Sequence, residues 1–79
     1  MTADPSKVMV TAGATAHAVQ VHHRDFPDAQ TDGESPAIAA RNLIGDLTRA
    51  LDSAATDQDR APIQQAIVDV QGFIDQAGA

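Results

Sequence analysis

The chain of 79 residues contains no cysteine, no tryptophan and no tyrosine, and only two phenylalanines. Without cysteine there can be no disulfide, no thiol catalysis and no thiolate metal site. Sixteen of its hydrophobic residues are alanines, so few large side chains remain to fill a core. A chain of this length buries only about 60% of its unfolded surface. We therefore expect one small domain that a second copy or a partner would stabilise.

Basic residues are also scarce, with five Lys and Arg against eleven Asp and Glu and a formal net charge of −6. The bases stand singly along the chain, whereas nucleic-acid binding needs clustered positive charge. The same sign of charge disfavours anionic membranes. No apolar run approaches about 18 residues, and no basic segment followed by an apolar one begins the chain. We expect a cytoplasmic protein with no direct nucleic-acid partner and no membrane partner.

The N-terminal third is typical of β-strands. Residues 1–6 form a polar leader, and residues 7–79 are predicted to form a single domain. A strand is predicted over 7–12, followed by a turn at Gly13 and a second strand over 15–23. In that strand one face carries His17, Val19, Val21 and His23, and the other carries Gln20 and His22. A helix over residues 12–18 is the alternative, but its glycine, threonines and valines favour a strand.

A corner is predicted at residues 25–28, because Pro27 removes a hydrogen-bond donor and restricts the residue before it. A short third strand, 29–32, follows. Ser35 can then cap a helix that has Pro36 at its first position. This helix is predicted over 36–55, with an apolar stripe of Ala39, Leu43, Leu47, Leu51 and Ala54.

A second helix is predicted over 59–77, with Thr56, Asp57 and Asp59 as capping residues for a start near Thr56 or Asp57. The linker before it is short enough to favour an antiparallel pair. Its wide apolar face carries Ile63, Ala66, Ile67, Val70, Phe73, Ile74 and Ala77. Its polar face is expected to carry Gln64, Gln65, Asp69, Gln71, Asp75 and Gln76. Three antiparallel strands followed by two helices on one sheet face define an α+β fold. The uncovered face or an edge of the sheet could be completed by a second subunit.

The histidines and the acids are the residues most able to support chemistry. His17, His22 and His23 with Asp25 could ligate zinc or nickel, but neighbouring residues of a strand point to opposite faces. We therefore expect surface histidines and no metal site. The acidic run of Asp25, Asp28, Asp32 and Glu34 lacks the spacing of a calcium loop, so we expect solvated carboxylates. No nucleophile motif and no phosphate loop is present, so we predict no catalytic residue, no cofactor and no enzyme.

The stretch from His23 to Leu51 resembles the N-terminal domain of the HicB-like antitoxin family. Asp25-Phe26-Pro27 stands at the family's first motif, Thr31-Asp32-Gly33-Glu34-Ser35 at its second, and Ala39 and Asn42 match its helix. Arg24 and Asp28 depart from the family's usual proline and glycine. The resemblance implies a sheet-plus-helix domain similar to a truncated ribonuclease H fold without catalytic residues. It also implies a small basic ribonuclease as the partner protein. The DNA-binding module common in that family is not matched here.

The leading hypothesis is a non-enzymatic protein-interaction domain that forms a homodimer. Its partner-binding face is predicted to comprise His22, Arg24 and Asp28, with Phe26 as the apolar anchor. The acidic balance would attract a small basic partner. Two alternatives remain open: a self-associating accessory protein without a dedicated partner, and a histidine-based metal or pH sensor.

Overall fold

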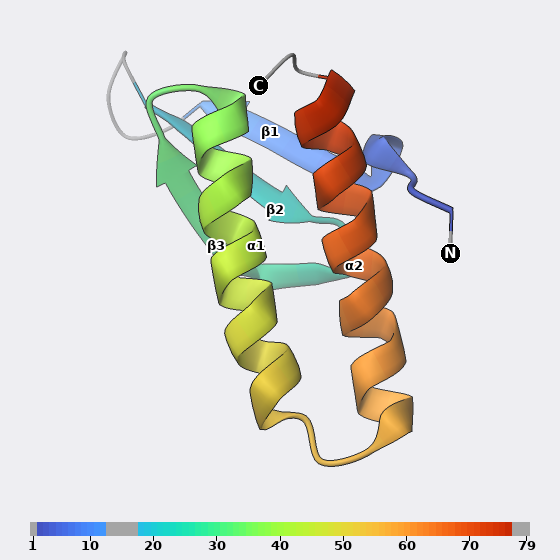
Figure 1. Ribbon diagram of the computed structural model, residues 1–79. Coiled ribbons are helices and arrows are strands. Elements are labelled where there is room, and N and C mark those ends of the chain that lie inside the picture. Colours follow the sequence, from blue (N-terminus) through green and yellow to red (C-terminus); the bar gives the residue numbers. More distant parts are fainter. Residues whose placement is uncertain (1, 13–17, 77–79) are drawn as a thin grey trace.

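The computed structural model describes residues 2–12 and 18–76 of the chain. The elements are a 3-10 turn η1 (Pro5–Lys7), strands β1 (Val8–Ala12), β2 (Val19–His23) and β3 (Phe26–Gly33), and helices α1 (Pro36–Ser53) and α2 (Asp57–Gln76). The strands form one antiparallel sheet in the order β1-β2-β3 (Figure 1). The predicted α+β fold with its β-β-β-α-α order is therefore confirmed.

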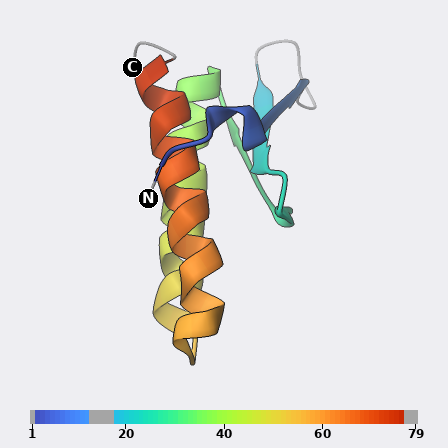
Figure 2. The same cartoon turned by 90° about the vertical axis from the view of Figure 1, so that its right-hand side faces the viewer.

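The molecule has two layers. Both helices pack against one face of the sheet, and the other face is not covered by any described element (Figure 2). The helices lie side by side and extend well beyond the end of the sheet (Figure 1). Successive side chains of β2 point to opposite faces of the sheet. Val21 and His23 are buried beneath the helices, and His22 points to the uncovered face.

Strand β3 is longer than predicted. It begins at Phe26 rather than Ala29, and the corner is confined to the turn at Arg24 and Asp25. Pro27 is accepted within β3 because this is an edge strand, where a missing backbone donor costs no ladder hydrogen bond. The pairing with β2 shifts register between Val21 and His23. Strand β2 begins at Val19, and predicted strand residues 15–17 lie outside the described part of the chain.

The start of α1 follows from its sequence. The Ser35 hydroxyl accepts a hydrogen bond from the Ile38 amide at 3.3 Å, and Pro36 occupies the first turn, as predicted. The Thr31 hydroxyl donates to the Ala39 carbonyl at 2.6 Å, which fixes the helix against β3. Gly33 permits this close approach, because a Cβ there would lie 2.5 Å from the Ala39 nitrogen.

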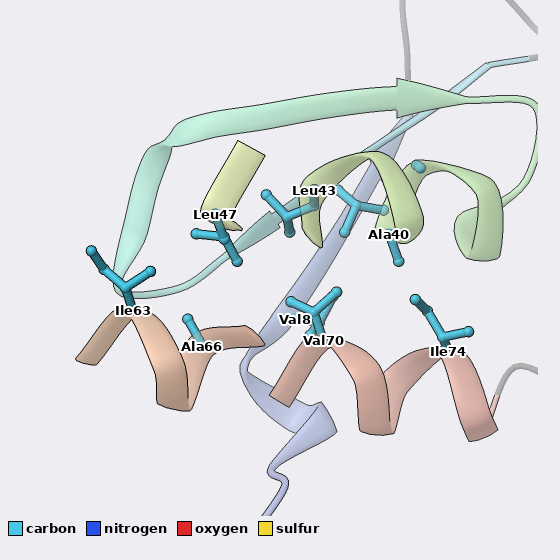
Figure 3. Packing of buried hydrophobic residues seen from close by; sticks show 10 residues of the cluster. Val8, Ala40, Leu43, Leu47, Ile63, Ala66, Val70 and Ile74 are labelled. Carbon is cyan, nitrogen blue, oxygen red and sulfur yellow. The ribbon is translucent and has the colours of Figure 1, made fainter. Parts of the chain in front are cut away.

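Helix α2 begins at Asp57, two residues before the predicted range 59–77 but at the predicted capping residues, because the Thr56 hydroxyl accepts a hydrogen bond from the Asp59 amide at 3.1 Å. Pro62 consequently lies beyond the first turn, at an exposed position where water can satisfy the carbonyl that lacks its donor. The hydrophobic core lies between the helices and the sheet (Figure 3). Its labelled side chains are Val8, Ala40, Leu43, Leu47, Ile63, Ala66, Val70 and Ile74.

Candidate functional site

A buried acid on α2 is the main departure from the sequence prediction. Asp69 was expected on the polar face of the second helix, but it is 0% exposed and points toward the sheet. That prediction is wrong because Asp69 lies one turn from both Ala66 and Phe73, at the border of the apolar stripe. A buried carboxylate is costly unless it is hydrogen-bonded. Its partners therefore decide what it does.

Three hydrogen bonds satisfy this carboxylate, and each has a length of 2.8 Å. The Asp69 Oδ2 atom contacts His23 Nε2 at the end of β2. The Oδ1 atom accepts from the Asp4 backbone amide and from Gln65 Nε2, which lies one turn earlier on α2. We call His23, Gln65, Asp69 and the Asp4 amide the buried polar cluster. The same Gln65 amide group also donates to the Thr2 carbonyl at 2.8 Å.

The hydrogen-bond partners of His23 assign a role to each of its ring nitrogens. Its Nδ1 atom accepts a hydrogen bond from the Asp25 amide at 3.1 Å, so this nitrogen carries no proton. The proton therefore lies on Nε2 and is donated to Asp69. The ring contacts Phe26, with centroids 5.9 Å apart. His23 is only 1% exposed, so the expectation that all three histidines lie at the surface is wrong for this one.

The hydrogen bonds also set the charge of Asp69. Burial alone would raise the pKa of Asp69, because a charged carboxylate is poorly solvated inside a protein. Hydrogen bonds from His23, Gln65 and the backbone favour the ionised form and outweigh burial, so the pKa is lowered from its ordinary value of 3.8. The cluster therefore holds Asp69 as an ionised carboxylate inside the fold.

We expect this cluster to make stability sensitive to acid. Because the pKa of Asp69 is lower in the folded chain, its stabilisation is complete above the ordinary value of 3.8 and is lost as the pH falls below it. The stability difference between the wild type and Asp69→Asn should thus be constant near neutrality and shrink below that value. Urea unfolding of both proteins across this pH range measures the difference. A difference that stays constant down to full protonation would contradict the assignment.

A histidine beside an aspartate also occurs in general-base catalysis, but the geometry here favours a structural role. Both ring nitrogens of His23 already bind protein groups, and the ring is almost fully buried. A general base needs a free nitrogen within reach of the proton that it removes. The buried polar cluster instead joins the N-terminal segment, the end of β2 and the middle of α2.

The residues predicted to bind a partner do not form a single face. His22 lies on the uncovered face of the sheet, where it pairs with Met9. Arg24 and Asp28 are exposed, in the β2–β3 turn and on β3. Phe26 is half-buried and packs on the helix side, opposite His23. Sequence patterning could not place Phe26, because the register shift in β3 changes which side its residues face.

The described residues contain no group of side chains that could form the zinc or nickel site considered from the sequence. His22 and His23 point to opposite faces, as their spacing in the strand predicts, and His17 lies outside the described chain. Within residues 2–12 and 18–76 no group of three histidine or acidic side chains could hold an ion. The Nδ1 atom of His22 is covered from solvent and has no hydrogen-bond partner in that part of the chain.

Together these features define a small two-layer α+β domain with an internal polar cluster and an uncovered sheet face. No protein-family model, no curated protein and no solved structure matches this chain. Among the described helices, none is both long and apolar enough to cross a membrane.

Proposed function

We propose that this chain is a non-catalytic protein-interaction domain that resembles the N-terminal domain of a HicB-like antitoxin. The main support for this proposal is the uncovered face of the sheet, since both helices lie on the other face. The uncovered face carries the side chains of Met9, Thr11, Gln20, His22 and Asp32. These residues belong to that side because they pair with one another across the three strands. A broad, uncharged-to-acidic surface of this kind suits a protein partner better than a small substrate.

Charge supports a basic partner. Asp28 and Asp32 are exposed on β3, and Asp25 is exposed in the preceding turn. With a net charge of −6, the domain attracts a small basic protein at long range. Arg24 lies among these acids and would pair with an acid of the partner.

A charge-reversal variant tests this proposal. The tagged protein is used to isolate bound proteins from its native host, and mass spectrometry identifies any small basic protein that co-purifies in a fixed ratio. Affinity for that purified protein is then measured by calorimetry. We expect Asp28→Lys to weaken binding by about tenfold or more, because the mutation removes an attraction and adds a repulsion at the contact.

Asp52→Lys is the matched control. Asp52 is exposed near the end of α1, far from the uncovered face, and this change alters the net charge equally. We expect it to weaken binding only slightly. An equal loss in both variants would show a nonspecific charge effect, and isolation of no basic partner would contradict the proposal. Phe26→Ala is a less suitable variant because Phe26 also packs against the core.

A second candidate function is self-association without a dedicated partner protein. The observation that favours it is strand β1, which forms an edge of the sheet and carries no charged residue. This candidate predicts that the purified domain is a stable oligomer and that no basic protein co-purifies with it.

A further inference from the structure

The two edges of the sheet differ in how they are protected. Edge strands commonly carry charges or proline, which prevent pairing with another chain. The β3 edge has this protection in Pro27, Asp28 and Asp32. The β1 edge, Val8–Ala12, has neither charge nor proline and is rich in β-branched residues. In the described sheet β1 has β2 as its neighbour on one side and no strand on the other.

The backbone of β1 is oriented for further pairing. The Lys7 carbonyl accepts a hydrogen bond from the Arg24 amide at 2.8 Å, so Lys7 faces β2. Because antiparallel pairing alternates along a strand, the backbone groups of Val8, Val10 and Ala12 point away from β2. The Val8 amide is already bonded to the Pro5 carbonyl. Within the described chain, no strand lies beyond β1 to pair with Val10.

Val10 is the centre of this edge. It is the middle residue of β1 and is 44% exposed, one of two large hydrophobic residues so exposed among those described. A two-fold axis beside Val10 would place its amide and carbonyl opposite those of a second Val10. It would also place Met9 opposite Thr11 and Val8 opposite Ala12, so no like charges would face each other. The strand is therefore complementary to itself.

We propose that two copies of this chain pair antiparallel along β1, with Val10 opposite Val10, to form one continuous sheet. Each copy contributes its three strands, and the Val10 residues exchange both backbone hydrogen bonds. The Ala12 amide of each copy donates to the Val8 carbonyl of the other. This dimer involves no other protein, so it can be tested independently of the proposed binding of a basic protein.

Charge favours the β1 edge over the β3 edge for this contact. In the joined sheet the two β3 strands lie at the outer edges, separated by five strand spacings, or about 24 Å. This separation exceeds the Debye length of about 8 Å at physiological ionic strength, so repulsion between the acids of β3 is screened. Pairing through β3 would instead bring Asp28 and Asp32 of both copies together.

Opposite charges at position 10 test both the contact and its register. Sedimentation equilibrium should give the wild type twice the chain mass of 8.2 kDa. Val10→Lys and Val10→Glu should each sediment as a monomer, because like charges then face each other. An equal mixture of the two variants should recover the doubled mass, since lysine then lies opposite glutamate. Circular dichroism should show that each variant is folded, as expected for an exposed position.

Thr11→Lys is the control, because it places a lysine on the same strand but opposite Met9 rather than opposite itself. It should remain mostly dimeric. A monomeric wild type at about 1 mM would overturn the proposal. So would a Val10→Lys variant that stays dimeric, a mixture that fails to recover the dimer, or complete dissociation of Thr11→Lys. None of these measurements uses a partner protein, so they are independent of the Asp28→Lys result.

Discussion

Replacing Asp69 with alanine is expected to lower the free energy of unfolding by about 3 to 5 kcal/mol. The substitution removes the acceptor of three donors: the buried ring of His23, and the half-buried Gln65 side-chain amide and Asp4 backbone amide. Unsatisfied buried donors cost more than a lost hydrogen bond, because they remain shielded from water. For a domain this small, such a loss approaches its entire stability.

Urea unfolding monitored by circular dichroism measures this effect. Asp75→Ala is the matched control, because Asp75 is exposed on the same helix and its carboxylate accepts a hydrogen bond from the exposed Gln71 side chain at 3.3 Å. We expect the control to change stability by less than about 0.5 kcal/mol. Equal, small effects for both variants would mean that water replaces the missing carboxylate and that the buried polar cluster is not essential to the fold.

Leu47→Ala is expected to destabilise the protein by about 2 to 5 kcal/mol. Leu47 is fully buried between the two helices, where Figure 3 shows it near Ile63 and Ala66. Removing its isobutyl group leaves a cavity, and the surrounding helices can collapse into it only partly. The effect should be large because so few bulky residues fill this core.

Ile38→Ala provides the comparison, because Ile38 lies on the same helix but is 42% exposed. We expect a loss of less than about 1 kcal/mol, in proportion to the smaller area that leaves water. Guanidinium unfolding curves with equal slopes would allow the two variants to be compared directly. A loss below about 0.5 kcal/mol for Leu47→Ala would contradict the packing shown in Figure 3.

The helices could be predicted because their signals are local. Ser35 and Pro36 specify the first turn of α1, and the regular spacing of Leu43 and Leu47 specifies its buried side. The antiparallel arrangement of α1 and α2 follows from the short connection between them. The end of α1 and the start of α2 each differ from prediction by two residues, because the backbone geometry at Ala54 and capping by Thr56 decide them.

The extent of β3 could not be read from its sequence. Pro27 and two acids argue against a strand, and only the position of β3 at the edge of the sheet makes them acceptable. Strand order is a property of the whole chain rather than of residues 26–33. The register shift opposite β2 is similarly a tertiary feature, and it moved Phe26 to the helix side.

The buried polar cluster was missed because each of its residues is ordinary alone. His23 ends an alternating strand, and Asp69 borders an apolar stripe, which are patterns that surface residues also show. The two residues could have been linked only by considering them together. His23 lies on the same strand face as the buried Val21, and Asp69 lies beside the buried Ala66 at the edge of the apolar stripe of α2. A basic and an acidic side chain at the margins of two apolar faces that pack together can satisfy each other.

The cluster has a consequence for the order in which the chain can fold. Asp69 binds groups that lie 46 and 65 residues earlier in the sequence. During synthesis, His23 and the Asp4 amide emerge from the ribosome long before their acceptor does. Contacts between such distant residues require the closure of long loops and slow the folding of small domains. We therefore expect the nascent sheet and α1 to remain without their native packing until nearly all of α2 has been translated.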